Sequence, residues 1–232
     1  AGIYISLGAN VATTVLSGGT LDPGLAKFLA GSVFSVGLML VLIPGSELFT
    51  GNILMAIGLI YKKYSFLKML RNWLVVYIGN LTGSILIAWL ILKAGLLVSN
   101  GTLTPLGVTA INISETKLGL AFSEALSRGI LCNMLVCLAV IMSIASKTII
   151  GKIFGIYFPI MTFVASGYEH SVANMYFLPA GLMAGGRFPQ EFLSMFTNLI
   201  PVTIGNIIGG LLIVLLHPKI EKKLAVVIFK RR

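Results

Sequence analysis

The stretch Ser166-Gly-Tyr-Glu-His-Ser-Val-Ala-Asn174 separates two apolar segments and places two titratable residues, Glu169 and His170, side by side between them. An ionisable residue within a bilayer costs about 2.5–3.5 kcal/mol on insertion scales, so it is rarely found there without a role. That role is either a functional site or a buried, satisfied pair that fixes a loop. The stretch predicts a break in a membrane-spanning helix, with a polar site at the break.

The composition is that of an integral membrane protein. Of the 232 residues, 57% are hydrophobic and only 10% are charged, whereas an average soluble domain has about 25% charged residues. Long apolar stretches satisfy the requirement of about 20 residues per helical span, without the alternation that a transmembrane barrel requires. We therefore expect an all-α polytopic membrane protein that forms a single membrane domain over residues 1–232.

Charge and cysteine usage argue against several other classes of protein. The net charge of +10 comes from Lys and Arg residues between spans and in the tail, which do not form a folded basic face for nucleic acid. Cys132 and Cys137 lie five apart within an apolar segment, a spacing that suits neither a disulfide framework nor a metal site. The chain opens at Ala1 without an initiator Met, so we expect a further N-terminal segment to precede it.

Six apolar segments are predicted to be the membrane spans. They are approximately Ala1–Gly18, Phe28–Ile43, Trp73–Val98, Leu118–Ala145, Ile153–Ala165 and Leu199–Leu216. The second and fifth are short, and each is followed after a polar break by another short apolar piece, Ile53–Tyr61 or Val172–Met183. At 1.5 Å per residue, neither piece of such a pair crosses a core of about 30 Å alone. The second and fifth helices are therefore predicted to be broken.

The two breaks resemble each other in sequence. Gly45-x-Glu47-x-x-x-x-Asn52 matches Gly167-x-Glu169-x-x-x-x-Asn174, and this alignment places Leu48 opposite His170. The spans that follow also match, because Asn72, Gly79, Asn80 and Gly83 recur with identical spacing as Asn198, Gly205, Asn206 and Gly209. Three spans per half would make the second half enter the membrane from the opposite side, so we predict an inverted three-plus-three repeat. The repeats cover about residues 1–100 and 115–217, with a solute site between them near the bilayer midplane.

The distribution of charged residues predicts the orientation of the chain. With six spans, twelve of the 17 Lys and Arg residues fall on the side of the two termini. Cytoplasmic loops carry an excess of these residues, so both termini are expected to be cytoplasmic. The basic tail, residues 218–232, has apolar residues at helical spacing and is expected to form an interfacial helix on the lipid bilayer. Glu124 and Arg128, four residues apart in the fourth span, are expected to form a structural ion pair.

The polar residues of the breaks are predicted to have different roles. Glu47 and Glu169 recur in the repeat with Asn52 and Asn174, so we assign these four residues mainly to fixing the loops. His170 does not recur, and its unperturbed pKa of about 6.5 lets it hold or release a proton. Two half-helix N-termini directed at the midplane would add partial positive charge, which favours a small anion. With no second His or Cys nearby, a metal site is not expected.

Apolar residues beside the breaks have two alternative roles. They either pack in the core or form constrictions that block hydrated ions. The residues concerned are Leu48, Phe49 and Phe163. Thr50, in the first break, adds a hydroxyl group that is expected to reorient with its loop.

These residues together resemble the formate/nitrite transporter family. The resemblance covers nearly the whole chain and rests on five motifs: Ala1-Gly-Ile-Tyr-Ile, Gly45-Ser-Glu-Leu-Phe-Thr50, Gly129-Ile-Leu-Cys-Asn-Met-Leu-Val-Cys-Leu-Ala139, Val164-Ala-Ser-Gly-Tyr-Glu-His-Ser-Val-Ala-Asn-Met175 and Asn198-Leu-Ile-Pro-Val-Thr-Ile-Gly-Asn-Ile-Ile-Gly209. It implies an aquaporin-like protomer of six helices in a homopentamer with one pore per protomer. It also implies passage of small monovalent anions such as formate, nitrite, hydrosulfide or lactate, and some family members of this appearance are hydrosulfide channels.

Several residues match functional positions of that family. His170 matches its central pore histidine, and Thr50 matches the threonine of its mobile loop. Asn133 matches a polar residue that faces the pore, and Lys117 matches a basic residue of the outer vestibule. The hydrophobic constrictions of the family are matched by Leu38, Leu48, Phe49, Val136 and Phe163.

The predicted function is a channel or permease for the anions of weak acids in the inner membrane of a prokaryote, without enzymatic activity or a cofactor. We expect the anion to cross as the neutral acid, or with its charge offset by a proton on or near His170. The alternatives are a proton-coupled anion symporter and a neutral-solute channel for water or glycerol. A membrane enzyme could use Glu169 and His170 as an acid–base pair, but catalysis usually needs a further nucleophile or metal, which the sequence does not supply.

Overall fold

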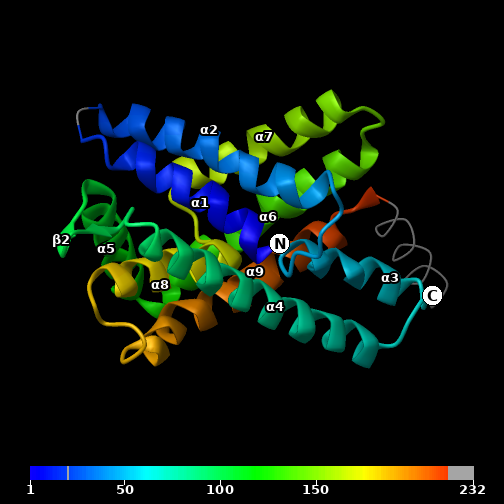
Figure 1. Ribbon diagram of the computed structural model, residues 1–232. Helices are drawn as coiled ribbons and strands as arrows, with labels where there is room; N and C mark the ends of the chain where they lie inside the picture. The colour runs from blue at the N-terminus through cyan, green and yellow to red at the C-terminus, as the bar shows by residue number, and fades with distance from the viewer. Residues whose placement is uncertain (20, 219–232) are drawn as a thin grey trace, which may run out of the picture.

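Helices make up most of the part of the protein that the structure describes. The computed structural model describes residues 1–19 and 21–218, and Figure 1 shows long helices that run side by side, with a short hairpin at one end. The elements are α1 (Gly2–Leu16), α2 (Pro23–Leu42), η1 (Gly51–Met55), α3 (Ala56–Ile60), α4 (Phe66–Lys93), β1 (Val98–Ser99), β2 (Thr102–Leu103), α5 (Pro105–Leu118), α6 (Phe122–Ala145), α7 (Ile149–Ala165), α8 (Ser171–Ala184), η2 (Phe192–Ser194) and α9 (Met195–Leu215). All but the first residue of the predicted interfacial tail lies outside the described residues.

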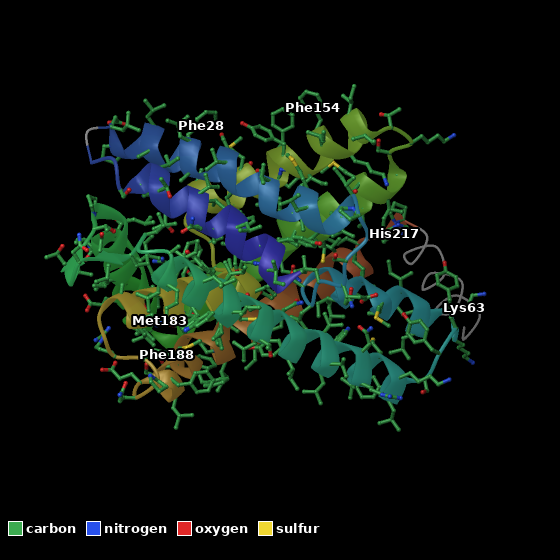
Figure 2. All side chains as sticks on the ribbon, viewed as in Figure 1. Phe28, Lys63, Phe154, Met183, Phe188 and His217 are labelled. Atoms are coloured by element: carbon green, nitrogen blue, oxygen red, sulfur yellow. The ribbon has the colours of Figure 1, made fainter. Side chains whose placement is uncertain are left out.

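The outer surface of the helices is apolar, as a bilayer requires. Within the described part of the chain, four helices are long and apolar enough to cross a membrane: Pro23–Leu42, Phe66–Lys93, Phe122–Ala145 and Phe192–Leu215. Phe28 on α2 and Phe154 on α7 point away from the other helices (Figure 2), and they are 44% and 56% exposed. Large exposed apolar patches indicate an interaction surface, which for helices of this length is the lipid.

The second span is longer than the sequence analysis predicts. α2 begins at Pro23 because the carboxylate of Asp22 accepts hydrogen bonds from the N–H groups of Gly24 (2.8 Å) and Leu25 (3.2 Å). Asp is a favoured capping residue, and proline suits the first helical position. With 20 residues, α2 is about 30 Å long and can cross the hydrocarbon core by itself. The prediction that this piece is too short was wrong.

A helix that was not predicted from the sequence, α5, precedes the fourth span. The fourth span was predicted to begin at Leu118, but Leu118 is the last residue of α5. After a short turn, the span itself, α6, begins at Phe122. α5 is more polar than the spans, and it starts where the Thr104 hydroxyl accepts a hydrogen bond from the N–H of Gly107 (3.0 Å). Before it, β1 and β2 form an antiparallel hairpin, which is a small exception to the predicted all-α fold.

The second and fifth predicted spans are both interrupted. Residues 43–50 separate α2 from η1 and α3, and residues 166–170 separate α7 from α8. α8 packs against α1, α4 and α5, and every residue of α8 except Phe177 is buried. The N-terminus of α8, where His170 lies, is therefore in the interior.

The backbones of α6 and α9 are in close contact. A Cβ atom at Gly205 would lie 2.3 Å from the backbone oxygen of Leu126, which is closer than real Cβ contacts. At Gly79, which the sequence repeat aligns with Gly205, a Cβ atom would meet nothing within 4 Å. Small residues let membrane helices approach closely, so Gly205 is needed for packing and Gly79 is not.

Gly205→Ala is expected to lower stability by about 1–3 kcal/mol, because α6 and α9 must move apart to admit the methyl group. Gly79→Ala is the matched control. It should leave stability unchanged or raise it by up to about 1 kcal/mol, since alanine favours the helix more than glycine does. Thermal unfolding in detergent measures both changes. Equal unfolding temperatures would mean that the α6–α9 contact tolerates a methyl group.

Candidate functional site

His170 makes two hydrogen bonds through its ring at the N-terminus of α8. Its Nδ1 atom accepts a hydrogen bond from the N–H of Ala173 (3.1 Å), so the ring caps the helix. Its Nε2 atom lies 2.8 Å from the hydroxyl oxygen of Thr50, in the other break. Because Nδ1 accepts, the neutral ring carries its proton on Nε2 and donates it to Thr50. Both residues are buried, so this contact joins the two breaks in the interior.

Glu169 is held by two partners. Lys117 Nζ lies 2.8 Å from Oε1 and 2.9 Å from Oε2, and the side-chain amide of Asn174 donates to Oε2 (2.6 Å). The side chains of Lys117 and Glu169 are 13% and 6% exposed, so the two charges balance each other in a largely buried site. Asn198 accepts from the amide of Asn174 (2.7 Å) and donates to the carbonyl of Lys117 (2.9 Å). The ammonium group of Lys117 is thus paired with the carboxylate of Glu169.

The first break repeats this arrangement without a lysine. The side-chain amide of Asn52 donates to the carboxylate of Glu47 and to Oδ1 of Asn72 (2.8 Å). The indole N–H of Trp73 donates to the backbone carbonyl of Asn52 (2.9 Å) and fixes the same segment. Glu47 is exposed, and none of the ion pairs among the described residues involves it. The two halves therefore share the Glu–Asn–Asn hydrogen bonds but not the ion pair.

A second pair of asparagines holds the backbone of the breaks. In the second break, the side chain of Asn206 donates to the carbonyl of Glu169 (3.0 Å) and accepts from the N–H of Ser171 (2.9 Å). In the first break, the side chain of Asn80 makes the equivalent two bonds on either side of Leu48. It donates to the carbonyl of Glu47 (3.3 Å) and accepts from the N–H of Phe49 (3.0 Å). The sequence repeat contains both asparagines, but their spacing alone does not indicate which groups they bind.

A cavity of about 150 Å³ opens beside His170. Its lining includes Lys117, Glu169, Asn174 and Phe163. A second space also borders His170 and Phe163 but is too narrow to admit a water molecule. The remaining side chains around this narrow space are apolar: Ile5, Phe34, Leu38, Val136 and Ile160. The structure thus brings three of the residues predicted for constrictions, Leu38, Val136 and Phe163, together at His170.

Leu48 and Phe49 border neither of these two spaces. Both are buried, and the ring of Phe49 packs edge-on against Tyr77 and Trp73, with centroids 5.0 and 6.3 Å apart. Phe49 also borders a groove between α4 and α9. Aromatic packing holds the ring of Phe49 on the α4 side of the loop, away from His170, and its expected place in a constriction stays a prediction.

Asn133 holds the loop of the first break. Its side-chain amide donates to the backbone carbonyls of Thr50 (3.2 Å) and Asn206 (2.7 Å), and Asn133 borders neither space beside His170. The thiol of Cys137 lies 3.7 Å from the same Thr50 carbonyl oxygen. Thr50 is therefore fixed by its backbone to α6 and by its hydroxyl to His170. Two backbone carbonyls engage the Nδ2 atom of Asn133, whereas its buried Oδ1 atom has no hydrogen-bond partner among the described residues, and its expected place facing the pore stays a prediction.

Glu124 and Arg128 do not form the predicted ion pair within the described residues. Glu124 instead accepts a hydrogen bond from the N–H of Ala121 (3.2 Å) at the start of α6, as acidic residues of the first turn often do. The carbonyl of Arg128 accepts from the N–H of Glu169 (3.3 Å), which ties α6 to the second break. In the part of the chain that the structure describes, no three His, Cys, Asp or Glu side chains are placed to hold a metal ion.

The fold and the site together define a class of protein. Apolar helices of membrane-spanning length surround two helix breaks that meet at a buried histidine, beside a cavity and a narrow apolar space. Non-helical backbone at this depth is tolerated only where protein or a polar cavity surrounds it, as in the discontinuous helices of transporters. These features are those of a helical membrane transport protein.

The chain belongs to the formate/nitrite transporter family, whose family model matches residues 1–219. It is 44% identical over 234 residues to a probable formate transporter of Methanothermobacter thermautotrophicus, over 92% of this chain and 83% of that one. It is 38% identical over 233 residues to the formate channel FocA of Escherichia coli K12, over 92% and 81%. A solved structure described as a pentameric formate channel with formate bound matches with a TM-score of 0.81 and 36% identity, over 92% and 90%. These relatives are transporters or channels, so the chain is a transport protein and not an enzyme.

Proposed function

We propose that the chain is a channel for small monovalent anions of weak acids, with formate, nitrite and hydrosulfide as its candidate solutes. The observation that carries the proposal is the buried contact of 2.8 Å between Thr50 and His170, which joins the two breaks beside the cavity. In an otherwise apolar passage, the histidine can donate a hydrogen bond to an anion or exchange a proton with it. The related proteins named as formate channels make formate the first solute to test.

We further propose a single membrane domain of six spans, in which inverted repeats of about residues 1–100 and 115–217 form an aquaporin-like protomer. The recurrence of the Glu–Asn–Asn hydrogen bonds in both breaks supports this arrangement. The repeat also aligns Tyr77 with Thr203, and their hydroxyl oxygens lie 3.2 Å apart. Contacts between equivalent residues are expected where a pseudo-two-fold axis passes between two repeats.

In the proposed route, the anion enters an outer vestibule lined by Lys117 and Glu169 and then meets an apolar constriction around His170. The constriction consists of Leu38, Val136 and Phe163. An apolar constriction disfavours a bare charge, so the anion crosses as the neutral acid or with its charge offset by a proton on or near His170. Movement of the first break brings Leu48 and Thr50 into or out of this route, and the four loop-fixing residues of the two breaks limit that movement.

We propose that the protein assembles as a homopentamer in the inner membrane of a prokaryote, with both termini cytoplasmic. The related solved structure is described as pentameric. Lys63, in the turn between α3 and α4, lies at the same end of the helices as His217, after α9 (Figure 2). The sequence adjoining these two residues is basic, and the positive-inside rule assigns such an end to the cytoplasm.

Flux into proteoliposomes tests the proposed function. Vesicles that contain the purified protein are expected to take up formate faster than protein-free vesicles, with nitrite and hydrosulfide as competitors. A pH indicator inside the vesicles separates two mechanisms, since a symporter moves protons in a fixed ratio to the anion and a simple channel does not. Osmotic swelling in glycerol or water without any anion flux would contradict the proposal and indicate a neutral-solute channel.

A further inference from the structure

We infer that Asn206 and Asn133 are positioning residues that set the contact between Thr50 and His170. The inference rests on the proposed function, because it concerns the control of the proposed pore site. Neither asparagine borders the two spaces beside His170, so each acts through the groups that it holds. Together they form a series of hydrogen bonds that runs from α9 through α6 to the first break.

The side chain of Asn206 holds the peptide groups on both sides of His170. Its Oδ1 atom accepts from the N–H of Ser171 (2.9 Å), and its Nδ2 atom donates to the carbonyls of Glu169 (3.0 Å) and Gly129 (2.8 Å). Asn206 is 0% exposed, so water does not replace any bond that is lost. Because Gly129 belongs to α6, this amide ties the second break to both α6 and α9.

Asn133 extends the series to the first break. Its Nδ2 atom donates to the backbone carbonyls of Asn206 (2.7 Å) and Thr50 (3.2 Å), and Asn133 is also 0% exposed. Gly210 leaves room for this amide, since a Cβ atom there would lie 2.8 Å from Asn133 Nδ2. One asparagine thus places the backbone beside His170, and the other places the backbone of Thr50. The 2.8 Å contact between the side chains of Thr50 and His170 therefore depends on both asparagines.

Formate flux into proteoliposomes that contain the full chain tests this inference. Asn206→Asp keeps the acceptor for Ser171 but loses both donors, and Asn133→Leu keeps the approximate size but loses the bridge. Each variant is expected to lower formate flux about tenfold, as the loss of one or two buried hydrogen bonds can do, and to flatten its dependence on pH. Tyr176→Phe is the control, because it removes a hydrogen bond to Asn10 (2.8 Å) elsewhere on α8. It should lower the unfolding temperature but keep the pH dependence.

A double-variant cycle separates a positioning role from general damage. If Asn133 acts through Thr50, adding Asn133→Leu to Thr50→Val lowers flux much less than Asn133→Leu does alone. Independent, fully additive losses would overturn the inference, and so would a wild-type pH profile in the folded single variants. If Asn206→Asp fails to fold, Asn133→Leu alone tests the inference, because it leaves the hydrogen bonds of the Asn206 side chain to Glu169 and Ser171 in place. Absence of formate flux through the wild-type protein would overturn the proposed function itself, and this inference with it.

Discussion

Glu169→Gln is expected to destabilise the protein by about 3–5 kcal/mol, the range found when one partner of a buried ion pair is removed. The carboxylate of Glu169 is 6% exposed and lies 2.8 and 2.9 Å from Lys117 Nζ. Glutamine would leave the ammonium group of Lys117 without its counter-ion in a largely buried site. Glu47→Gln is the matched control at the equivalent position of the other break. Glu47 is exposed and has no described ion pair, so its replacement should change stability little.

Thermal unfolding of the two variants in detergent measures this difference. The double variant Lys117→Met/Glu169→Gln is the decisive control, because removing both charges is expected to restore much of the stability that Glu169→Gln loses. Equal losses at Glu169 and Glu47 would contradict a stabilising role for the ion pair. A double variant as unstable as Glu169→Gln alone would show that the loss does not arise from the unpaired ammonium group of Lys117.

The repeated residues of the breaks show how far spacing along a chain can predict a structure. Asn52 and Asn174 each follow a glutamate at the same spacing, and in the structure each side-chain amide donates a hydrogen bond to that glutamate. Polar groups at this depth need partners inside the protein, so a repeated pair of polar residues indicates a repeated contact. Apolar length likewise predicts a helical membrane protein. The start of α2 was predicted too late, at Phe28. The helix begins at Pro23, before Lys27, because Asp22 caps its N-terminus.

The parts of the site that the sequence could not predict depend on contacts distant in sequence. Lys117 lies 52 residues before Glu169, on α5, a helix too polar to be recognised as a span. Phe49 stands next to Thr50 in the chain, but its ring packs against Tyr77 while the Thr50 hydroxyl contacts His170. Periodicity predicts side-chain direction in helices and strands, and a loop such as residues 43–50 has none.

His170→Asn is expected to keep the fold and to remove most of the pH dependence of formate flux, because it takes the titratable ring out of the proposed route. Asparagine is among the best capping residues, so it can replace Nδ1 as the acceptor for the N–H of Ala173. It has no equivalent of Nε2, which lies 2.8 Å from the Thr50 hydroxyl. His170→Ala removes both contacts and should cost about 1 kcal/mol of stability through the lost cap. The two variants therefore separate the capping role from the proposed role in proton exchange.

The direction of the pH effect follows from the two ring nitrogens. A second proton on Nδ1 makes this atom a donor, so a protonated His170 loses its bond to the N–H of Ala173 and presents a positive charge to the anion. Formate flux through the wild-type protein should therefore rise as the pH falls. The rise should exceed the increase in the fraction of formate that is present as the neutral acid. Thr50→Ser keeps the hydroxyl oxygen and should retain this rise, whereas Thr50→Val should not. If wild type and His170→Asn give the same profile, His170 serves only to cap α8, and the proton must travel with the solute as the neutral acid.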